Sequence, residues 1–301
     1  MRVLGVGHCT LDHIGVVERF PEPDFKKEFL QFSTQGGGAA ATAVVALSRW
    51  GVDTRFVGKV GADARGDEIE RTLAEEGVDT QFMVHQDGAV SQLSFIVVES
   101  SSGRKQTYTM GGNVTELSAA EVDLDCLDDA TLLLCDGTHM EAEIAVMRAA
   151  RERDIPIVLD ASEVGSDIRE AVANCTYLVA SERFASQFAG VGQLDSLCQA
   201  LLEKGPETVV VTLGNEGSVA MSAADRKLVR TQAIDVDVFD TTGAGDVFHG
   251  GVILGILNDW PLERTVGFAN VAAGLSCQGI GGRSAIPTVE DVEKVQKASD
   301  R

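Results

Sequence analysis

Residues 240–254 read DTTGAGDVFHGGVIL, a glycine-containing turn that runs directly into an apolar, helix-forming stretch. Gly243 and Gly245 leave backbone N–H groups unscreened where that helix begins, and such groups bind anions. Asp246 adds a carboxylate to the same first turn. An acid that complements the helix dipole, or glycines that make a tight turn, would explain each feature separately. Together they favour a phosphoryl-transfer site, which needs donors for developing charge beside a base for the attacking hydroxyl.

Outside this stretch, short β-branched runs alternate with amphipathic helical segments. This alternation predicts an α/β fold, in which a largely parallel central sheet is flanked by helices on both faces. The predicted strands cover residues 2–7, 54–60, 131–136, 155–160, 177–180 and 208–213, and the predicted helices cover residues 39–50, 67–76, 141–153, 194–204 and 244–257.

Two segments interrupt the alternation, at residues 14–34 and 92–110. The second contains two strand-like runs around a turn at residues 100–103, which predicts a β-hairpin. Strand-rich insertions are natural covers for a site, so we expect both segments to form a small β lid. No internal repeat or low-complexity linker divides the chain, and residues 1–301 are therefore expected to form a single domain.

Composition narrows the function. The chain has 301 residues, of which 44% are hydrophobic, enough for one large α/β core. With 46 acidic and 25 basic residues its net charge is −21, which would repel nucleic acid and anionic membranes. A bound phosphate would then depend on local dipoles, a few cations and metal. Six scattered cysteines favour reduced, buried thiols, and no leader or membrane-spanning segment is evident, so a cytoplasmic protein is expected.

Residues 240–250 resemble the C-terminal signature of the ribokinase-like (PfkB) carbohydrate kinases, and residues 36–43, GGGAAATA, resemble that family's N-terminal diglycine motif. A glycine run before an alanine-rich helix could be only a close-packed turn, but the pair of motifs is specific. The resemblance extends over nearly the whole chain, with further matches at Gly7, Asp12 and residues 58–66, 212–217 and 281–287. It implies a ribokinase-like fold that transfers phosphate from ATP to a sugar hydroxymethyl group.

By this resemblance Asp246 is the catalytic base, and the N–H groups of Gly243, Ala244 and Gly245 contribute to an anion hole. Asp240 would belong to a monovalent-cation loop, which makes K⁺ a candidate cofactor beside Mg²⁺ and ATP. An aspartate that only caps the turn is the alternative for Asp240.

On the sugar side, the resemblance implies that Asp12 binds hydroxyl groups, and a carboxylate can accept from two of them at once. We place Asp12 at the carboxyl end of the first strand, where open α/β sheets bind ligands. An ordinary loop aspartate is the alternative. Gly37 and Gly38 would let the backbone approach the sugar closely.

On the nucleotide side, Thr212, Gly214 and Gly217 would pass alongside ATP, although a tight turn between two strands would also explain the glycines. Asn270 and Gly274 would line the adenine pocket, and simple helix packing explains them equally well.

The chain departs from the family pattern at two places. Residues 181–184 read SERF where many members have Asn-x-x-Glu, so Glu182 is the carboxylate left to act on Mg²⁺, through water. Thr42 replaces the asparagine that often ends the diglycine motif, so the sugar pocket differs from that of a standard ribokinase. The motifs most resemble those of sulfofructose kinases and, more loosely, ketohexokinases.

An anionic substrate would need buried cations. Lys26 or Lys27 could supply one, but Thr138 and Met110 fall where an arginine and an asparagine would be expected. We therefore prefer a neutral ketohexose such as fructose over sulfofructose or a sugar phosphate. His139, Asn113 and Arg104 stay unassigned, as rim residues or plain surface polar residues.

Two other functions stay open. A nucleoside kinase of the same family would need an apolar slot for the base, which the sequence neither supplies nor excludes. A sugar-binding regulator without catalysis would not need the intact turn around Asp246. Exposed strands of the lid would favour a homodimer.

Overall fold

The computed structural model describes residues 1–102, 104–190 and 192–299, so Gly103 of the predicted hairpin turn lies outside it. The strands are β1 Arg2–Val6, β2 Thr10–Val17, β3 Gln31–Gly37, β4 Asp53–Val57, β5 Lys59–Gly61, β6 Val84–Gln86, β7 Leu93–Glu99, β8 Lys105–Met110, β9 Ala130–Cys135, β10 Ile157–Ala161, β11 Tyr177–Ser181, β12 Thr208–Thr212, β13 Ser218–Ser222 and β14 Val229–Thr231. The helices are α1 Ala39–Arg49, α2 Ala64–Ala74, α3 Met140–Glu152, α4 Ile168–Asn174, α5 Glu182–Ala189, α6 Leu194–Leu202, α7 Ala244–Leu257, α8 Leu262–Ser276 and α9 Val289–Ser299, with short 3-10 turns at Leu124–Leu127 and Gly214–Glu216.

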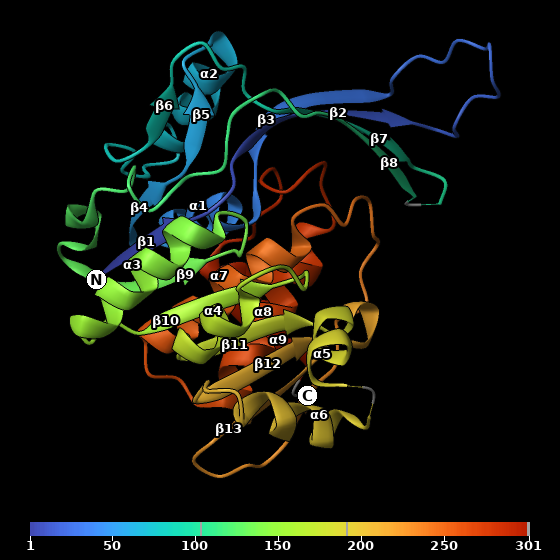
Figure 1. Ribbon diagram of the computed structural model, residues 1–301. Coiled ribbons are helices and arrows are strands. Elements are labelled where there is room, and N and C mark those ends of the chain that lie inside the picture. Colours follow the sequence, from blue (N-terminus) through green and yellow to red (C-terminus); the bar gives the residue numbers. More distant parts are fainter. Residues whose placement is uncertain (103, 191, 300–301) are drawn as a thin grey trace.

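The central sheet has eight strands in the order β14-β13-β12-β11-β10-β9-β1-β4 (Figure 1). Strands β4, β1, β9, β10, β11 and β12 are parallel to one another. At the other edge, the pairs β12–β13 and β13–β14 are antiparallel. Strands in such a sheet are buried on both faces. In β1, Val3 faces one core while Leu4 and Val6 face the other. The predicted α/β fold with a largely parallel sheet is confirmed.

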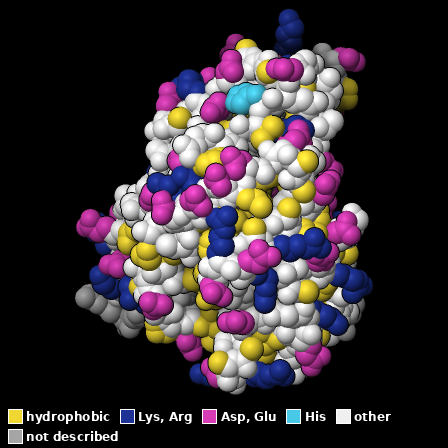
Figure 2. Space-filling model, turned by 60° about the vertical axis from the view of Figure 1, so that its left-hand side comes forward, with side chains coloured by type: hydrophobic (Ala, Val, Ile, Leu, Met, Phe, Trp, Pro, Cys, Tyr) yellow, Lys and Arg dark blue, Asp and Glu magenta, His cyan; other side chains and the backbone are white. Residues whose placement is uncertain are grey.

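Helices cover both faces of this sheet (Figure 1). Apolar side chains of α1, α7, α8 and α9 form the core on one face, and those of α3, α4, α5 and α6 form the core on the other. Among the described residues, no helix combines the length and apolar character needed to cross a bilayer. All six cysteines are buried and unpaired. On the face shown in Figure 2, acidic and basic side chains are interspersed.

A second sheet, in the order β3-β2-β7-β8, projects from one side of the central sheet (Figure 1). We call it the lid sheet. Its β7 and β8 form the predicted antiparallel hairpin. Ile14, Val16, Ile96 and Val98 point from β2 and β7 toward the main body, where they form a small core with Phe239 and Ile280. The lid sheet therefore rests on the segments that flank residues 240–246.

Local boundaries differ from prediction where the chain turns sharply. The predicted strand at residues 54–60 is two strands, β4 and β5, because Gly58 interrupts the ladder and its carbonyl accepts a hydrogen bond from Val84. Helices α4, α5 and α9 and strands β6, β13 and β14 were not predicted. All of them except α9, which has 11 residues, have eight residues or fewer, too short to show a clear hydrophobic period.

Helices α7 and α8 pack closely because glycine faces the contact. A Cβ atom added at Gly251 would lie 2.7 Å from the Cα atom of Ala269. At Gly267, on the outer side of α8, an added Cβ would lie 3.4 Å from the flexible side-chain end of Gln296.

We predict that Gly251→Ala forces α7 and α8 apart and lowers the free energy of unfolding by about 1–3 kcal/mol. Gly267→Ala is the matched control, because the same added methyl group meets no backbone, and removing a helical glycine should instead gain about 0.5–1 kcal/mol. Urea denaturation of both variants measures the difference, and equal stabilities would contradict the packing described.

Candidate active site

The turn of residues 240–246 is held rigidly at the start of α7. Asp240 is buried, and its Oδ1 accepts hydrogen bonds from the Thr242 N–H (2.9 Å) and hydroxyl (2.7 Å), while its Oδ2 accepts from the Gly281 N–H (2.8 Å). Gly243 has φ +74°, and a side chain there would collide with the backbone of Gly282. Asp240 therefore acts as the turn-capping aspartate, whatever else the loop binds.

Within the part of the chain that the structure describes, this arrangement leaves two backbone N–H groups at the start of α7 without an acceptor in the protein. Among the described residues, no protein group accepts a hydrogen bond from the N–H of Gly245 or Asp246, the second and third residues of α7. Unpaired N–H groups at a helix N-terminus form an anion site. From the lid sheet, Lys105 Nζ donates to Thr242 Oγ1 (3.1 Å), so a cation of β8 also reaches this turn.

Asp246 lies in a field of like charges. Burial raises its pKa well above the ordinary value, Asp160 and Asp136 raise it further, and Arg283 and Lys105 oppose the shift. A carboxylate with a raised pKa accepts a proton more readily than an exposed one.

Asp160 and His249 form a buried pair behind the turn. Burial raises the pKa of Asp160 in β10 to about 6, and the nearby His249 lowers it. His249 Nε2 lies 3.3 Å from Asp160 Oδ1, and His249 Nδ1 donates to the Gly245 carbonyl (2.6 Å). The pair connects the 240–246 turn to the carboxyl end of β10. Sequence reasoning missed both residues, although an aspartate at the end of a predicted strand was a signal.

Asp136, directly after β9, was also missed. Its Oδ2 accepts hydrogen bonds from the N–H groups of His8 (2.9 Å) and Ala40 (3.2 Å), and its Oδ1 accepts from Thr138 N–H (3.1 Å). Because Ala40 stands in the first turn of α1, Asp136 fixes the helix that follows the diglycine motif.

Asp12 does not lie at the carboxyl end of the first strand, as predicted, but inside β2 of the lid sheet, because the chain turns after β1 and starts a new strand at Thr10. Its side chain packs on Gly37, where any Cβ would collide with the carboxylate. Its Oδ1 is buried without a partner. Burial raises the pKa of Asp12, opposed by the Ser94 hydroxyl. The neighbouring Gly38 has φ +103° and closely approaches the His8 backbone. Asp12, Gly37 and Gly38 are thus brought together.

The other two sugar-side candidates, Thr42 and Lys26, lie in different parts of the structure. Thr42 is buried in α1 and faces Gly282, beside the 240–246 turn. Lys26 lies in the exposed connection of residues 18–30, which extends past the far end of the lid sheet (Figure 1). Its neighbour Lys27 pairs there with Glu18 (3.3 Å). The structure therefore does not bring Lys26 to the other candidates, because the β2–β3 connection carries it outward.

The five nucleotide-side candidates line one cavity of about 550 Å³, within the usual range of small-molecule sites. Its lining includes Thr212, Gly214, Gly217, Asn270 and Gly274. Ala244 and Gly245 of the 240–246 turn reach the same cavity, and Ile234, Val236 and Val238, which sequence reasoning missed, add apolar wall. The Asn270 amide donates to Ser218 Oγ (2.8 Å) and to the Val266 carbonyl (2.9 Å), so it also serves packing.

Glu182 is the exposed first residue of α5 and directly follows β11. It stands at the same carboxyl edge of the sheet as Asp160, but outside the 550 Å³ cavity. Within the described ranges, no three His, Cys, Asp or Glu side chains gather to hold a metal directly. The residues present suit an ion that keeps its water shell and binds phosphate oxygens, as Mg²⁺ does.

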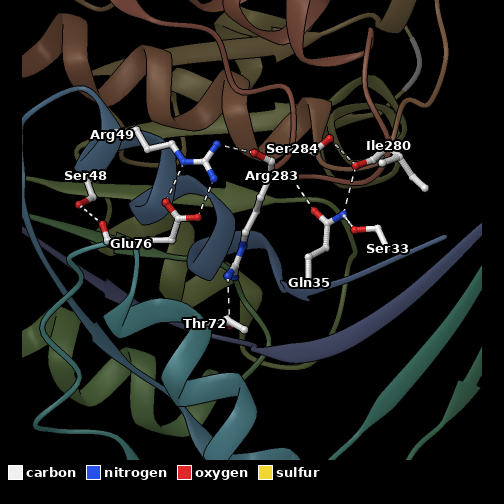
Figure 3. Close-up of polar contacts among 9 residues, drawn as sticks. All are labelled: Ser33, Gln35, Ser48, Arg49, Thr72, Glu76, Ile280, Arg283 and Ser284. Atoms are coloured by element: carbon white, nitrogen blue, oxygen red, sulfur yellow. Dashed lines mark hydrogen bonds and ion pairs between the residues drawn. The ribbon is translucent and has the colours of Figure 1, made fainter. Parts of the chain in front are cut away.

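Residues 280–284 connect this turn to the lid sheet and α2 (Figure 3). Gln35 of β3 accepts from Arg283 N–H (2.9 Å) and donates to the Ile280 carbonyl (3.1 Å). The Arg283 carbonyl accepts from Arg49, which is paired with Glu76 (2.6 Å). Burial lowers the pKa of Arg283 to about 10, and its guanidinium lies on the Gly36 side of β3. A movement of β3 would therefore shift the backbone at Gly282 and Gly243.

Comparison with known proteins agrees with this geometry. The profile described as pfkB family carbohydrate kinase matches residues 2–289, so the chain belongs to the PfkB family of carbohydrate kinases. It is an ATP-dependent phosphotransferase of the sugar and nucleoside kinase class.

Individual relatives are distant but cover the full length. An ATP-dependent ribose-1-phosphate kinase of Halopiger xanaduensis is 28% identical, covering 97% of each chain. A solved structure from Agrobacterium tumefaciens, provisionally named a ribokinase, is 28% identical with a TM-score of 0.92, covering 100% of this chain and 99% of its own. An E. coli protein provisionally named ribokinase II, solved with ATP and Mg²⁺, is 20% identical with a TM-score of 0.85, covering 98% and 99%, and shares the fold.

Proposed function

We propose that this protein transfers the γ-phosphoryl group of ATP to a hydroxymethyl group of a neutral ketohexose such as fructose, with Asp246 as the base. The observation that carries the proposal is the position of the 240–246 turn. Ala244 and Gly245 line the nucleotide cavity, while Asp246 shares the fields of Lys105 and Arg283 with Asp12 on the sugar side. Donor and acceptor substrates would meet at this turn.

In the proposed reaction, the sugar hydroxyl oxygen bonds to the γ-phosphorus while the bond to the bridging oxygen breaks and ADP leaves. The hydroxyl proton passes to Asp246, and the free N–H groups of Gly245 and Asp246 offset charge on the transferred group. Such a transfer depends mainly on positioning, which the fixed turn provides. When bound, Mg²⁺ would neutralise phosphate charge, held by ATP and by water near Glu182. K⁺ at the loop ordered by Asp240 is part of the proposal.

The neutral substrate is favoured by the placement of the cations. Lys26 lies away from the site, Lys105 is hydrogen-bonded to Thr242, and the Arg283 guanidinium lies on the face of β3 opposite Asp12. Sulfofructose or a sugar phosphate is the second candidate, and the name of the Halopiger relative is in its favour. A nucleoside kinase of the same family is the third candidate, and a regulator without catalysis is supported less, since Asp246 and its turn are complete.

We further propose that residues 1–301 form one domain and that the protein is cytoplasmic. The two apolar cores on either face of one continuous sheet support the first statement. Six unpaired, buried cysteines support the second, because free thiols are typical of reducing compartments.

We predict that Asp246→Asn lowers kcat by about 10²–10⁴-fold while the binding of ATP and sugar changes little, because asparagine keeps the shape but cannot take the proton. Asp67→Asn is the matched control, since Asp67 is also a first-turn acid of a helix but lies on the exposed surface of α2. ADP release and calorimetry measure the two effects. An Asp246→Asn enzyme with a rate near wild type would exclude Asp246 as the base.

We predict that kcat/KM rises with pH as Asp246 loses its proton, with a midpoint well above the ordinary aspartate pKa. Asp160→Asn removes a like charge that raises the pKa of Asp246, so the midpoint should move to lower pH even if the maximum rate falls. Profiles of kcat/KM against pH for wild type and variant measure this shift. An unchanged or higher midpoint would contradict the proposed coupling.

The outer face of the lid sheet supports a homodimer. The aromatic side chains of this region are 44–75% exposed, namely Phe25, Phe29, Phe32, Phe95 and Tyr108. The His13 ring stacks on Phe32 and makes a tilted contact with Phe95. Exposed apolar patches of this kind mark interfaces.

We predict that light scattering gives twice the 31.9 kDa chain mass, and that Phe32→Asp combined with Phe95→Asp gives single chains because two charges enter the interface. A wild-type protein that is monomeric at every concentration would contradict the dimer.

A further inference from the structure

A second cavity, of about 180 Å³, lies where the lid sheet meets the central sheet. Its lining includes His8, Lys59, Gln92, Thr138 and His139. It adjoins the sugar side of the site. Asp12 pairs with Ser94 in the parallel β2–β7 register, and Gln92, which lines the cavity, directly precedes β7.

His139, one of the residues that line this cavity, carries an unpaired donor. Its ring is 7% exposed and precedes α3 as the N-cap residue. Its Nδ1 accepts a hydrogen bond from the Leu117 N–H (3.3 Å), so in the neutral ring the proton sits on Nε2. Burial lowers the pKa of His139, which favours that neutral ring. Nε2 is buried and has no partner in the protein. Buried donors are nearly always paired, so this one indicates a missing acceptor.

The lysine that lines the cavity is already matched. Lys59 Nζ binds Glu121 Oε1 (2.7 Å) and Thr115 Oγ1 (2.8 Å). Burial lowers the pKa of His8, although Asp136 opposes the shift, so this ring also tends to be neutral. No unmatched cation is left among the lining residues that the structure describes. The cavity therefore offers hydrogen bonds to neutral oxygens but no compensation for a buried phosphate or sulfonate.

We propose that this cavity receives the end of the sugar remote from the phosphorylated hydroxymethyl group, and that His139 Nε2–H donates to a neutral hydroxyl there. His139 then determines specificity for uncharged sugars. The inference rests on the proposed function only in naming the end of the sugar that enters the cavity. It explains why a histidine that the sequence left unassigned is buried with a free donor.

The test is calorimetric sugar binding without ATP, to wild type, His139→Phe and His139→Gln. The ligands are fructose and tagatose, their single-deoxy analogues and their phosphate esters. We expect wild type to prefer the neutral parent sugar. His139→Phe should weaken the binding of that sugar about ten-fold, the effect of one lost hydrogen bond. It should also abolish the preference for the parent sugar over one particular deoxy analogue. His139→Gln should restore part of it, because its amide can donate from a similar place. His85→Phe is the matched control, because His85 of β6 is hydrogen-bonded to Glu70 and does not line the cavity.

The inference is overturned if the phosphate esters bind more tightly than the parent sugar, if no neutral sugar binds, or if His139→Phe keeps the wild-type discrimination. If His139→Phe fails to fold, two other results still test the inference. They are the order in which wild type binds the parent, deoxy and phosphorylated sugars, and the binding data for His139→Gln. ADP release is a separate readout. Sugar binding as expected without ADP release would defeat the proposed kinase function alone, and ADP release without an effect of His139 would defeat this inference alone.

Discussion

The site depends on the contact between two glycine backbones, Gly243 and Gly282. They approach so closely that a Cβ atom at Gly243 would lie 2.4 Å from the Gly282 Cα atom, and Asp240 holds the two segments together by accepting hydrogen bonds from Thr242 and Gly281. This contact sets where α7 begins and leaves its first N–H groups free. Through Gln35, Arg49 and Thr72 the same segment reaches the lid sheet, α1 and α2, so the 240–246 turn and the lid sheet share one support.

A chain with a net charge of −21 still builds an anion site because the favourable interactions are local. Helix N–H groups, Lys105 and Arg283 act at short range, while Asp136 and Asp160 raise the pKa of Asp246. Crowded buried acids cost stability, since folding must overcome their mutual repulsion. The return is a carboxylate whose raised proton affinity suits the role of base proposed for Asp246. On the sugar side, Asp12 and His139 present an unpaired acceptor and an unpaired donor, a pairing suited to neutral hydroxyl groups.

Sequence could predict the parts of the site that are local. Helix α7 was predicted at its observed bounds because glycines precede it and an apolar run defines it. The nucleotide-side candidates do line one cavity. Asp160, His249 and Asp136 were missed because the contacts that bring them to the site, Asp160–His249 and those of Asp136 with His8 and Ala40, join residues 89 or more positions apart. Lys26 was placed by charge alone, and only the path of the β2–β3 connection shows where it goes. His139 could not be assigned, because an unpaired nitrogen is visible only once its surroundings are folded.

The most direct test of the central claim is ADP release by the wild-type protein with Mg-ATP, across fructose, tagatose, ribose, sulfofructose, fructose phosphates and adenosine. The account predicts sugar-dependent ADP release that is fastest with a neutral ketohexose. Release only with adenosine or with an anionic sugar would contradict the assigned substrate class, and the absence of release with every sugar, while ATP still binds, would contradict the kinase function itself.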